Sequence, residues 1–182
     1  MNSFVPVEID ETLAPEINTQ NYSPKVMIDG VKIIQTKKFV GEEGDFSEIF
    51  RISKEGLVEG FPEFKVAQIN RTKLIGGSVK GWHLHLVQNE IWHMIPDGHL
   101  FVGLWDIRKN SPTRGKTMRI SVGEGIGYLV FIPRGVAHGA ANFTPDPVNL
   151  LYFVSEQFNH ENPDEKRIER DALGDDFWTP QE

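Results

Sequence analysis

The stretches Gly77–Gly98, GSVKGWHLHLVQNEIWHMIPDG, and Gly127–Asn142, GYLVFIPRGVAHGAAN, decide the fold of this chain. The first carries an H-x-H pair followed by Glu90, and it ends at a turn-forming Pro-Asp-Gly. The second carries a Pro-x-Gly turn followed by His138. Glycine and proline at the borders of these apolar runs are typical of short strands joined by tight turns.

The spacing of the polar residues in these stretches indicates a site. In a strand, alternation places His83 and His85 on one face and the apolar residues Trp82, Leu84 and Leu86 on the other. Two imidazoles on one face, an acid nearby and a histidine from a later strand suit a divalent metal. One interpretation is therefore that Fe, Mn, Ni or Zn binds to His83, His85, Glu90 and His138. In the other, His85 hydrogen-bonds inside the fold and Glu90 faces solvent.

Together the two stretches resemble the paired sequence motifs of the cupin superfamily. The resemblance implies an all-β fold, a double-stranded β-helix or jelly-roll barrel, with its site inside the barrel. The second motif matches the spacing of that superfamily, and the first is one residue longer between Glu90 and Gly98. Because one fold hosts many chemistries, the resemblance indicates the architecture more strongly than the reaction.

Length and composition limit the classes of protein that need to be considered. A chain of 182 residues favours one domain, and we expect an N-terminal arm over 1–24 and a single cupin domain over 25–182. The formal net charge of −7 argues against nucleic-acid and anionic-membrane partners. The absence of cysteine excludes disulfides. No apolar run reaches the ~20 residues of a membrane span, and no signal peptide is apparent, so we expect a cytoplasmic protein.

Short β segments dominate the chain from Phe64 onward, which favours a sandwich or barrel over alternating βα units. The expected segments are 65–70, 79–87, 91–95, 99–108, 116–121, 127–132 and 149–157. Upstream, we expect a hairpin or two short strands in Val26–Ile34 and a short helix in Ser53–Glu59. The charged stretch Pro163–Asp176 suits a surface turn or a short helical segment before the C-terminal aromatic residues dock.

Further motifs resemble the dTDP-4-dehydrorhamnose 3,5-epimerases. Asp106–Gly115 reads DIRKNSPTRG, similar to the DxRxxSPTxG of that family, and Ile132–Gly139 reads IPRGVAHG, similar to its IPxGxAHG. The resemblance covers the chain from about Lys38 onward. It implies an epimerase or isomerase that acts on a dTDP-4-keto-6-deoxyhexose-like sugar nucleotide. Such an enzyme abstracts a proton next to the keto group and requires no cofactor.

The resemblance also implies roles for individual residues. His83 falls on the catalytic base, and Tyr152 on the tyrosine that acts as an acid on the opposite face. The substrate-binding positions correspond to Phe46, Glu48, Gln68, Asn70, Lys80 and His138. Phe46 and Glu48 would reach into a neighbouring subunit, so we expect a homodimer. Lys80 and Arg71 would bind the diphosphate.

The chain departs from the family pattern at several positions. The lysine that donates to the enolate oxygen in the family corresponds to Glu90 or Ile91. Lys80 replaces an arginine, which exchanges a forked guanidinium for a point charge. The aspartate that orients the catalytic histidine in the family lies in a tail beyond the tryptophan. This chain ends at Glu182, so we expect no such partner for His83.

Three functions follow from these observations. The first, which we favour, is a nucleotide-sugar epimerase; the H-x-H pair also resembles the nucleotide-sugar 3,4-ketoisomerases. The second is a metal-dependent cupin enzyme, either a dioxygenase or a small-molecule isomerase. The third is a catalytically silent relative that binds a sugar nucleotide without turning it over.

Overall fold

A computed structural model describes residues 5, 7–10, 12–13, 17, 19, 26–95, 98–123 and 125–180. Most of the predicted arm over residues 1–24 and the terminal Glu182 therefore lie outside the described residues. Within the described part of the chain, no helix is long and apolar enough to cross a bilayer.

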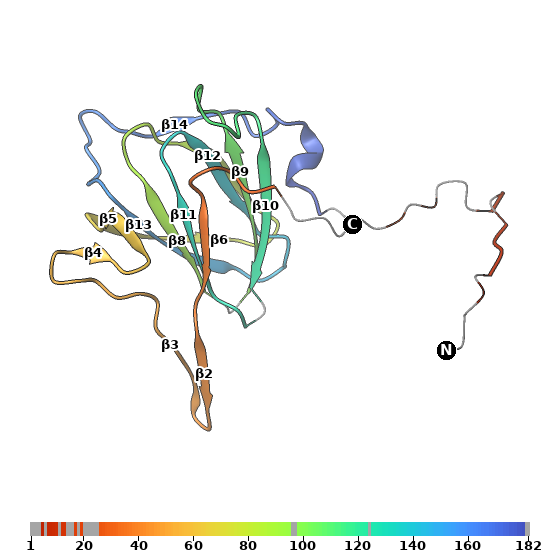
Figure 1. Ribbon diagram of the computed structural model, residues 1–182, viewed down its shortest axis with the longest axis horizontal. Coiled ribbons are helices and arrows are strands. Elements are labelled where there is room, and N and C mark those ends of the chain that lie inside the picture. The colour runs from red at the N-terminus through yellow and green to blue at the C-terminus, as the bar shows by residue number, and fades with distance from the viewer. Residues whose placement is uncertain are drawn as a thin grey trace.

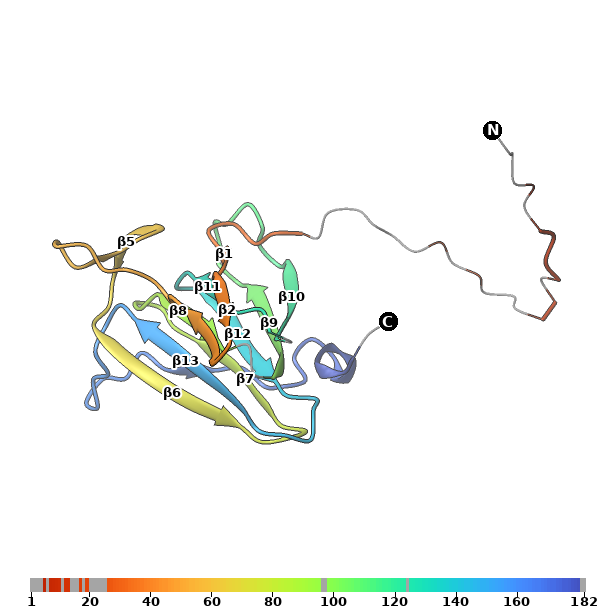
Figure 2. The same ribbon diagram turned by 90° about the horizontal axis from the view of Figure 1, so that it is seen from below.

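Two five-stranded antiparallel sheets face each other (Figure 1). The first sheet has the order β1 (Lys32–Gln35), β11 (Tyr128–Ile132), β8 (Glu90–Met94), β13 (Val148–Val154) and β6 (Gln68–Leu74). The second has the order β10 (Thr117–Gly123), β9 (His99–Asp106), β12 (Val136–Ala141), β7 (Val79–Leu84) and β14 (Lys166–Arg167). Sequential strands alternate between the sheets along much of the chain, so the predicted all-β jelly roll is confirmed (Figure 2).

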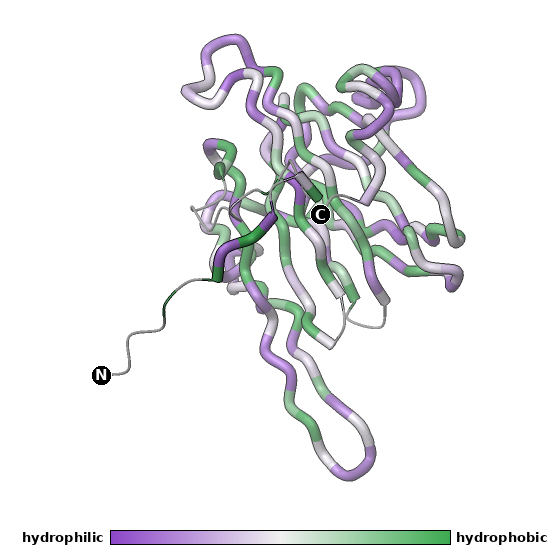
Figure 3. The backbone as a smooth tube through the Cα atoms, turned by 90° about the vertical axis from the view of Figure 1, so that its right-hand side faces the viewer, coloured by the Kyte–Doolittle hydropathy of each residue, from purple (hydrophilic) through white to green (hydrophobic). Residues whose placement is uncertain are grey.

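The core fills the space between the inner faces of the sheets. Its members alternate with outward-facing residues along each strand, as a half-buried strand requires. Fully or nearly fully buried examples are Met94, Val102, Leu104, Val130 and Leu150. Burying each such side chain contributes about 1.5–3 kcal/mol. Hydrophobic residues accordingly concentrate in the strands, whereas the loops at the top of Figure 3 are mainly hydrophilic.

Strand positions downstream of Phe64 agree with the sequence prediction to within a few residues, with three exceptions. β14, Lys166–Arg167, lies in the charged stretch Pro163–Asp176, where a surface turn or a short helical segment was expected, and it pairs with β7 instead. β12, Val136–Ala141, was not among the predicted segments because it follows the Pro-x-Gly turn directly and is rich in glycine and alanine. β7 ends at Leu84, so Leu86 lies beyond it and is 57% exposed. Trp82 and Leu84 pack together in an outer cluster, on the face predicted for them.

Two predictions for the upstream region are wrong. Ser53–Glu59 is not helical but a turn leading into β4 (Leu57–Val58), which pairs with β5 (Phe61–Lys65). The hydroxyl of Ser53 accepts the backbone N–H groups of Glu55 and Leu57 and so closes the turn. The segment Val26–Ile34 contributes only β1, after a turn at Asp29-Gly30.

A short 3-10 helix, Asp175–Trp178, brings the C-terminal aromatic residues against the outer face of the second sheet. Trp178 is only 5% exposed there. Glycines in three adjacent strands make the floor on which its ring lies. A Cβ at Gly103 or Gly139 would come within 2.8 or 2.7 Å of the Trp178 ring. The predicted docking of the tail is therefore confirmed. It depends on glycine at these positions, because a side chain there would collide with the tryptophan ring.

The hairpin of β2 (Lys38–Gly41) and β3 (Gly44–Ser47) projects away from both sheets (Figure 1). Apolar side chains on it face solvent within this chain. Phe39, Val40 and Phe46 are 57%, 80% and 65% exposed. Exposed apolar groups of this kind are common at interaction surfaces.

Candidate active site

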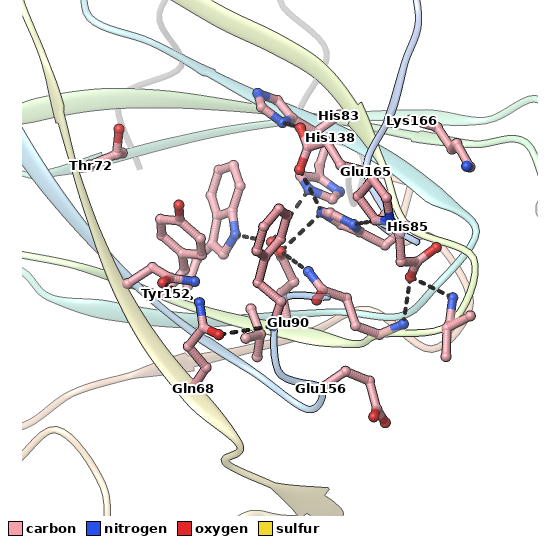
Figure 4. A pocket seen from close by; sticks show the side chains of 18 of the residues that line it. Gln68, Thr72, His83, His85, Glu90, His138, Tyr152, Glu156, Glu165 and Lys166 are labelled. Carbon is pink, nitrogen blue, oxygen red and sulfur yellow. Dashed lines mark hydrogen bonds and ion pairs between the residues drawn. The ribbon is translucent and has the colours of Figure 1, made fainter. Parts of the chain in front are cut away.

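A cavity of about 780 Å³ opens between the two sheets, at the end of the barrel that the core leaves unfilled. Leu74, Trp92, Ala140 and Leu150 belong both to the core and to the cavity lining, so the core forms the floor of the cavity. A volume of this size is in the range of small-molecule sites. Figure 4 shows Tyr152 and Gln68 on one side of the cavity and the three histidines on the other.

A β-bulge in β7 brings two polar side chains to the cavity. His83 pairs with His138 of β12, whereas Lys80 pairs with Ala140, so β7 contains one extra residue between these pairs. Simple alternation would place residues three apart on opposite faces, and the extra residue restores them to one face. Both Lys80 and His83 therefore line the cavity, while Trp82 packs outside.

His83 has a defined tautomer because charged groups contact both ring nitrogens. Its Nδ1 lies 2.6 Å from Oε1 of Glu165, and its Nε2 lies 2.8 Å from a terminal nitrogen of Arg167. A guanidinium can only donate, so Nε2 must carry a lone pair and Nδ1–H must donate to the carboxylate. That neutral form is the one that a general base needs. The expectation that His83 lacks a carboxylate partner is therefore wrong, because Glu165 provides it.

Glu165 and Arg167 are held in place by Asp164, which precedes them. The Asp164 carboxylate accepts the backbone N–H groups of Leu86, Val87 and Gln88 at 2.9, 2.8 and 2.9 Å. Burial acts to raise the pKa of Asp164, but these three donors lower it below its ordinary value. The aspartate thus stays ionised and fixes this segment to the loop that follows β7.

A second cluster lies beside His83. Glu90 is only 3% exposed; its two carboxylate oxygens lie 3.1 Å from Nε2 of His85 and 3.4 Å from Nε2 of His138. Burial acts to raise the pKa of Glu90, but the two histidines and the Trp92 N–H lower it to about 2. Burial also opposes protonation of His85, yet the contact with Glu90 raises the pKa of His85. Glu90 therefore faces into the cavity as a carboxylate, and the solvent-facing interpretation is wrong.

Tyr152 lies on the opposite wall, in β13 of the first sheet. Burial, and then the charges of Glu90 and Glu165, raise the pKa of Tyr152 above its ordinary value. The phenol therefore holds its proton at neutral pH and can deliver it as an acid. His83 comes from the second sheet and Tyr152 from the first, so the imidazole and the phenol face the cavity from opposite walls.

The structure also places the remaining residues predicted for the site. Gln68, Asn70 and Lys80 line the cavity together with the histidines. Phe46 and Glu48 lie outside it, on or next to the projecting hairpin, where Glu48 pairs with Arg51 at 3.0 Å. Arg71 lies on the outer face of β6 and donates to Asn149, so the prediction that it binds the diphosphate within this chain is wrong.

Sequence reasoning missed Glu165, Arg167 and Asp164. All three lie in a charged stretch, about 80 residues after His83, whose composition is that of an ordinary solvated loop. The sequence carries only a weak indication that this segment has a functional role. Pro-Asp-Glu-Lys-Arg follows an Asn-rich turn directly and is too polar to be a core strand. Nothing in its spacing indicates which residue reaches the histidine.

Comparison with known proteins places this site in a family. The sequence model of the dTDP-4-dehydrorhamnose 3,5-epimerase family matches residues 25–177. The chain belongs to this family. The family is one of epimerases, which are isomerases, so the predicted enzyme class is confirmed.

Relatives of the family resemble the chain over most of its length. The chain is 38% identical to the spore coat polysaccharide biosynthesis protein SpsL of Bacillus subtilis over 142 residues, 78% of this chain and 89% of that protein. It is 30% identical to a dTDP-4-dehydrorhamnose 3,5-epimerase of Sinorhizobium fredii over 84% of this chain and 78% of that protein. A Legionella pneumophila 3,5-epimerase structure in complex with dTDP-4-keto-L-rhamnose matches with a TM-score of 0.70 and 25% identity, over 86% and 82% of the two chains. These matches do not support a metal-dependent dioxygenase.

Proposed function

We propose that this chain epimerises a dTDP-4-keto-6-deoxyhexose, or a closely similar sugar nucleotide, through an enolate. The observation that carries the proposal is the state of His83. Its Nδ1–H is fixed by Glu165, its Nε2 carries a lone pair, and Tyr152 lies on the opposite wall of the same cavity. A base and an acid on opposite faces of a bound ring can remove a proton from one side and return one to the other.

In the proposed reaction, His83 Nε2 takes the proton from a carbon next to the ketone. The electrons of the broken C–H bond form a C=C bond, and the carbonyl π electrons move to oxygen and give the enolate. Tyr152 then donates its hydroxyl proton to the opposite face of the same carbon, and the enolate electrons return to form the ketone. Solvent reprotonates Tyr152 and removes the proton from His83, so no oxidant or metal is required.

Polar residues around this pair would bind the rest of the substrate. Gln68 and Asn70 in β6, which bond to each other at 2.7 Å, present amides to the sugar. Lys80, whose Nζ donates to Thr72 at 3.1 Å, offers a positive charge for the diphosphate. The Legionella structure, which contains dTDP-4-keto-L-rhamnose, supports this assignment of substrate class.

Solvent exchange tests the proposal. The protein is incubated with dTDP-4-keto-6-deoxy-D-glucose in deuterated water, and deuterium at the carbons next to the ketone is followed by NMR. We expect incorporation with the wild type and a loss of at least 10²-fold with His83→Asn, because general-base removal typically costs 10²–10⁴-fold. If a sugar nucleotide stabilises the wild type against heat while no deuterium enters, the chain is instead a silent binding relative.

A second proposal concerns His85, Glu90 and His138, whose ligand atoms lie within 4.8 Å of one another. The Nδ1 atoms of His85 and His138 contact the backbone carbonyls of Asp164 and Val136, so both Nε2 atoms face Glu90. Carbonyl-anchored imidazoles of this kind are typical of metal ligands. We propose that these three residues can bind Fe, Mn, Ni or Zn. His83 would not join them, since both its nitrogens are engaged. Elemental analysis before and after metal addition tests this; a content far below one ion per chain would contradict it.

The expected homodimer also stays a proposal. The exposed Phe39, Val40 and Phe46 of the projecting hairpin support it, because burying them against a second copy would remove apolar surface from water. Phe46 would then reach the cavity of the partner, as the family resemblance implies. Light scattering measures the mass in solution, and a monomer at micromolar concentration would contradict the proposal. The cytoplasmic location stays a prediction.

A further inference from the structure

Residues Glu156–Arg167, here called the strap, run along the mouth of the cavity between β13 and the end of β14. Most of its members line the cavity. It is attached to both sheets. Its Phe158 N–H donates to Gln68 of the first sheet at 2.9 Å, and Arg167 pairs with His83 of the second. The strap therefore brings charged side chains to the reacting part of the cavity from the edge of the second sheet.

The proposed reaction requires the Arg167 side chain to move. Its guanidinium donates to Nε2 of His83 at 2.8 Å, and its Nε lies 3.0 Å from Glu165. Nε2 is the atom that must receive the substrate proton, so the guanidinium has to leave it when the sugar binds. The Arg167 side chain is 59% exposed, so its movement is opposed by these two polar contacts rather than by packing.

The reaction also creates a negative charge that needs a donor. Preorganised donors at the developing oxyanion are usually the largest contribution to catalysis of this type. Glu90, the acid buried in this cavity, is ionised and cannot donate. Lys80 donates a hydrogen bond to Thr72. Among the described residues it makes no hydrogen bond to His83. Arg167 is the cation that already contacts the base.

We infer that Arg167 is a catalytic residue that moves from His83 Nε2 to the ketone oxygen of the substrate and stabilises the enolate. The carbonyl oxygen is two bonds from the carbon that loses its proton. A guanidinium displaced from the base by that carbon therefore needs only a short movement to reach the oxygen. As the C–H electrons pass to that oxygen, Arg167 donates a hydrogen bond to it and loses no proton. The inference rests on the proposed epimerase function.

Three variants test the inference in the full-length chain: Arg167→Met, Arg167→Lys and the control Arg170→Met, an exposed arginine that does not line the cavity. Solvent-deuterium incorporation into dTDP-4-keto-6-deoxy-D-glucose gives the rate at saturating substrate. Calorimetry with dTDP alone gives the affinity for the nucleotide. We expect Arg167→Met to lower the saturated rate roughly 10²–10³-fold, the usual cost of one oxyanion donor. Its dTDP affinity should stay within threefold of the wild type.

The variants separate the alternatives. Arg167→Lys keeps the charge and should retain more of the rate than Arg167→Met, and Arg170→Met should match the wild type. A rate for Arg167→Met equal to or above that of the wild type would show that Arg167 only caps the base, and would overturn the inference. An unchanged saturated rate with a dTDP affinity weakened tenfold or more would assign it to the diphosphate instead. If the wild type itself incorporates no deuterium, the proposed function fails rather than the role of Arg167.

Discussion

Replacing Glu165 with glutamine isolates the carboxylate that fixes the tautomer of His83. The substitution keeps the size of the side chain and removes its charge at the 2.6 Å contact with Nδ1. A hydrogen bond to a charged group contributes about 1.5–3 kcal/mol, and the 37% exposure of Glu165 favours the lower half of that range. At about 1.4 kcal/mol per tenfold, the loss of charge alone lowers kcat about 10- to 40-fold.

The glutamine amide adds a second effect. It can donate to Nδ1 and so favour the tautomer with its proton on Nε2, which cannot act as a base. We therefore expect kcat to fall about 10²-fold in total. The hydrogen bond from His83 holds the pKa of Glu165 below its ordinary 4.5, so the carboxylate is charged across the neutral range. The full loss should therefore be measured at pH 7, where Glu165 of the wild type is charged. It should shrink only as the pH falls below 4.5 and Glu165 of the wild type takes up a proton.

The assay is the initial rate of deuterium incorporation between pH 4 and 8, with thermal unfolding as a check on the fold. Glu169→Gln, an exposed acid that does not line the cavity, is the matched control. The reasoning is refuted if Glu165→Gln keeps activity within twofold of the control at pH 7. It is refuted equally if the loss is accompanied by a large fall in Tm and no change in the pH dependence, because Glu165 would then be only structural.

Three further predictions concern other parts of the molecule. Tyr152→Phe should lower epimer formation roughly 10²-fold while deuterium exchange at the abstracted position falls less, because only the acid is removed; equal losses in product and exchange assays would contradict this. Glu90 has a pKa lowered to about 2, so it contributes stability above its ordinary 4.5 that is lost as the pH falls towards 2. Tm should therefore drop over that interval in the wild type and less in Glu90→Gln, as calorimetry can measure; parallel curves would count against it. Asp106→Asn should cost about 3–5 kcal/mol of unfolding free energy, since it breaks the buried network with Arg108, Ser111 and Thr113. Urea denaturation measures that loss, and a cost below about 1 kcal/mol would show that the network is dispensable.

The fold could be predicted because its determinants are local in the sequence. Alternation and turn residues decide where β7, β8 and β11 run, and many short strands separated by turns predict a sandwich or barrel. The choice of a jelly roll came from the resemblance of the two motif stretches to the cupin superfamily. The helix expected at Ser53–Glu59 failed because its residues suit a helix about as well as a turn. There the hydroxyl of Ser53 and the pairing of Leu57-Val58 decided the outcome.

The site was predictable only where it lies in the two motif stretches. His83, Glu90 and His138 lie at positions that alternation and motif spacing can place, although the bulge that turns Lys80 inward is invisible in the sequence. Glu165 and Arg167 were not predictable, because they approach His83 through tertiary contact. Their position depends on one aspartate that accepts three backbone N–H groups about 80 residues away.

The strap carries both charged partners of the base on a single short peptide that ends in the edge strand β14. An acid and a guanidinium two residues apart can therefore be exchanged together, with changes to the short edge strand β14 but not to the strands of the core. Grafting this loop between relatives would transplant the electrostatic environment of the base and leave the scaffold intact. Specificity for a different keto sugar can then arise from substitutions in the strap, without changes to the hydrophobic core.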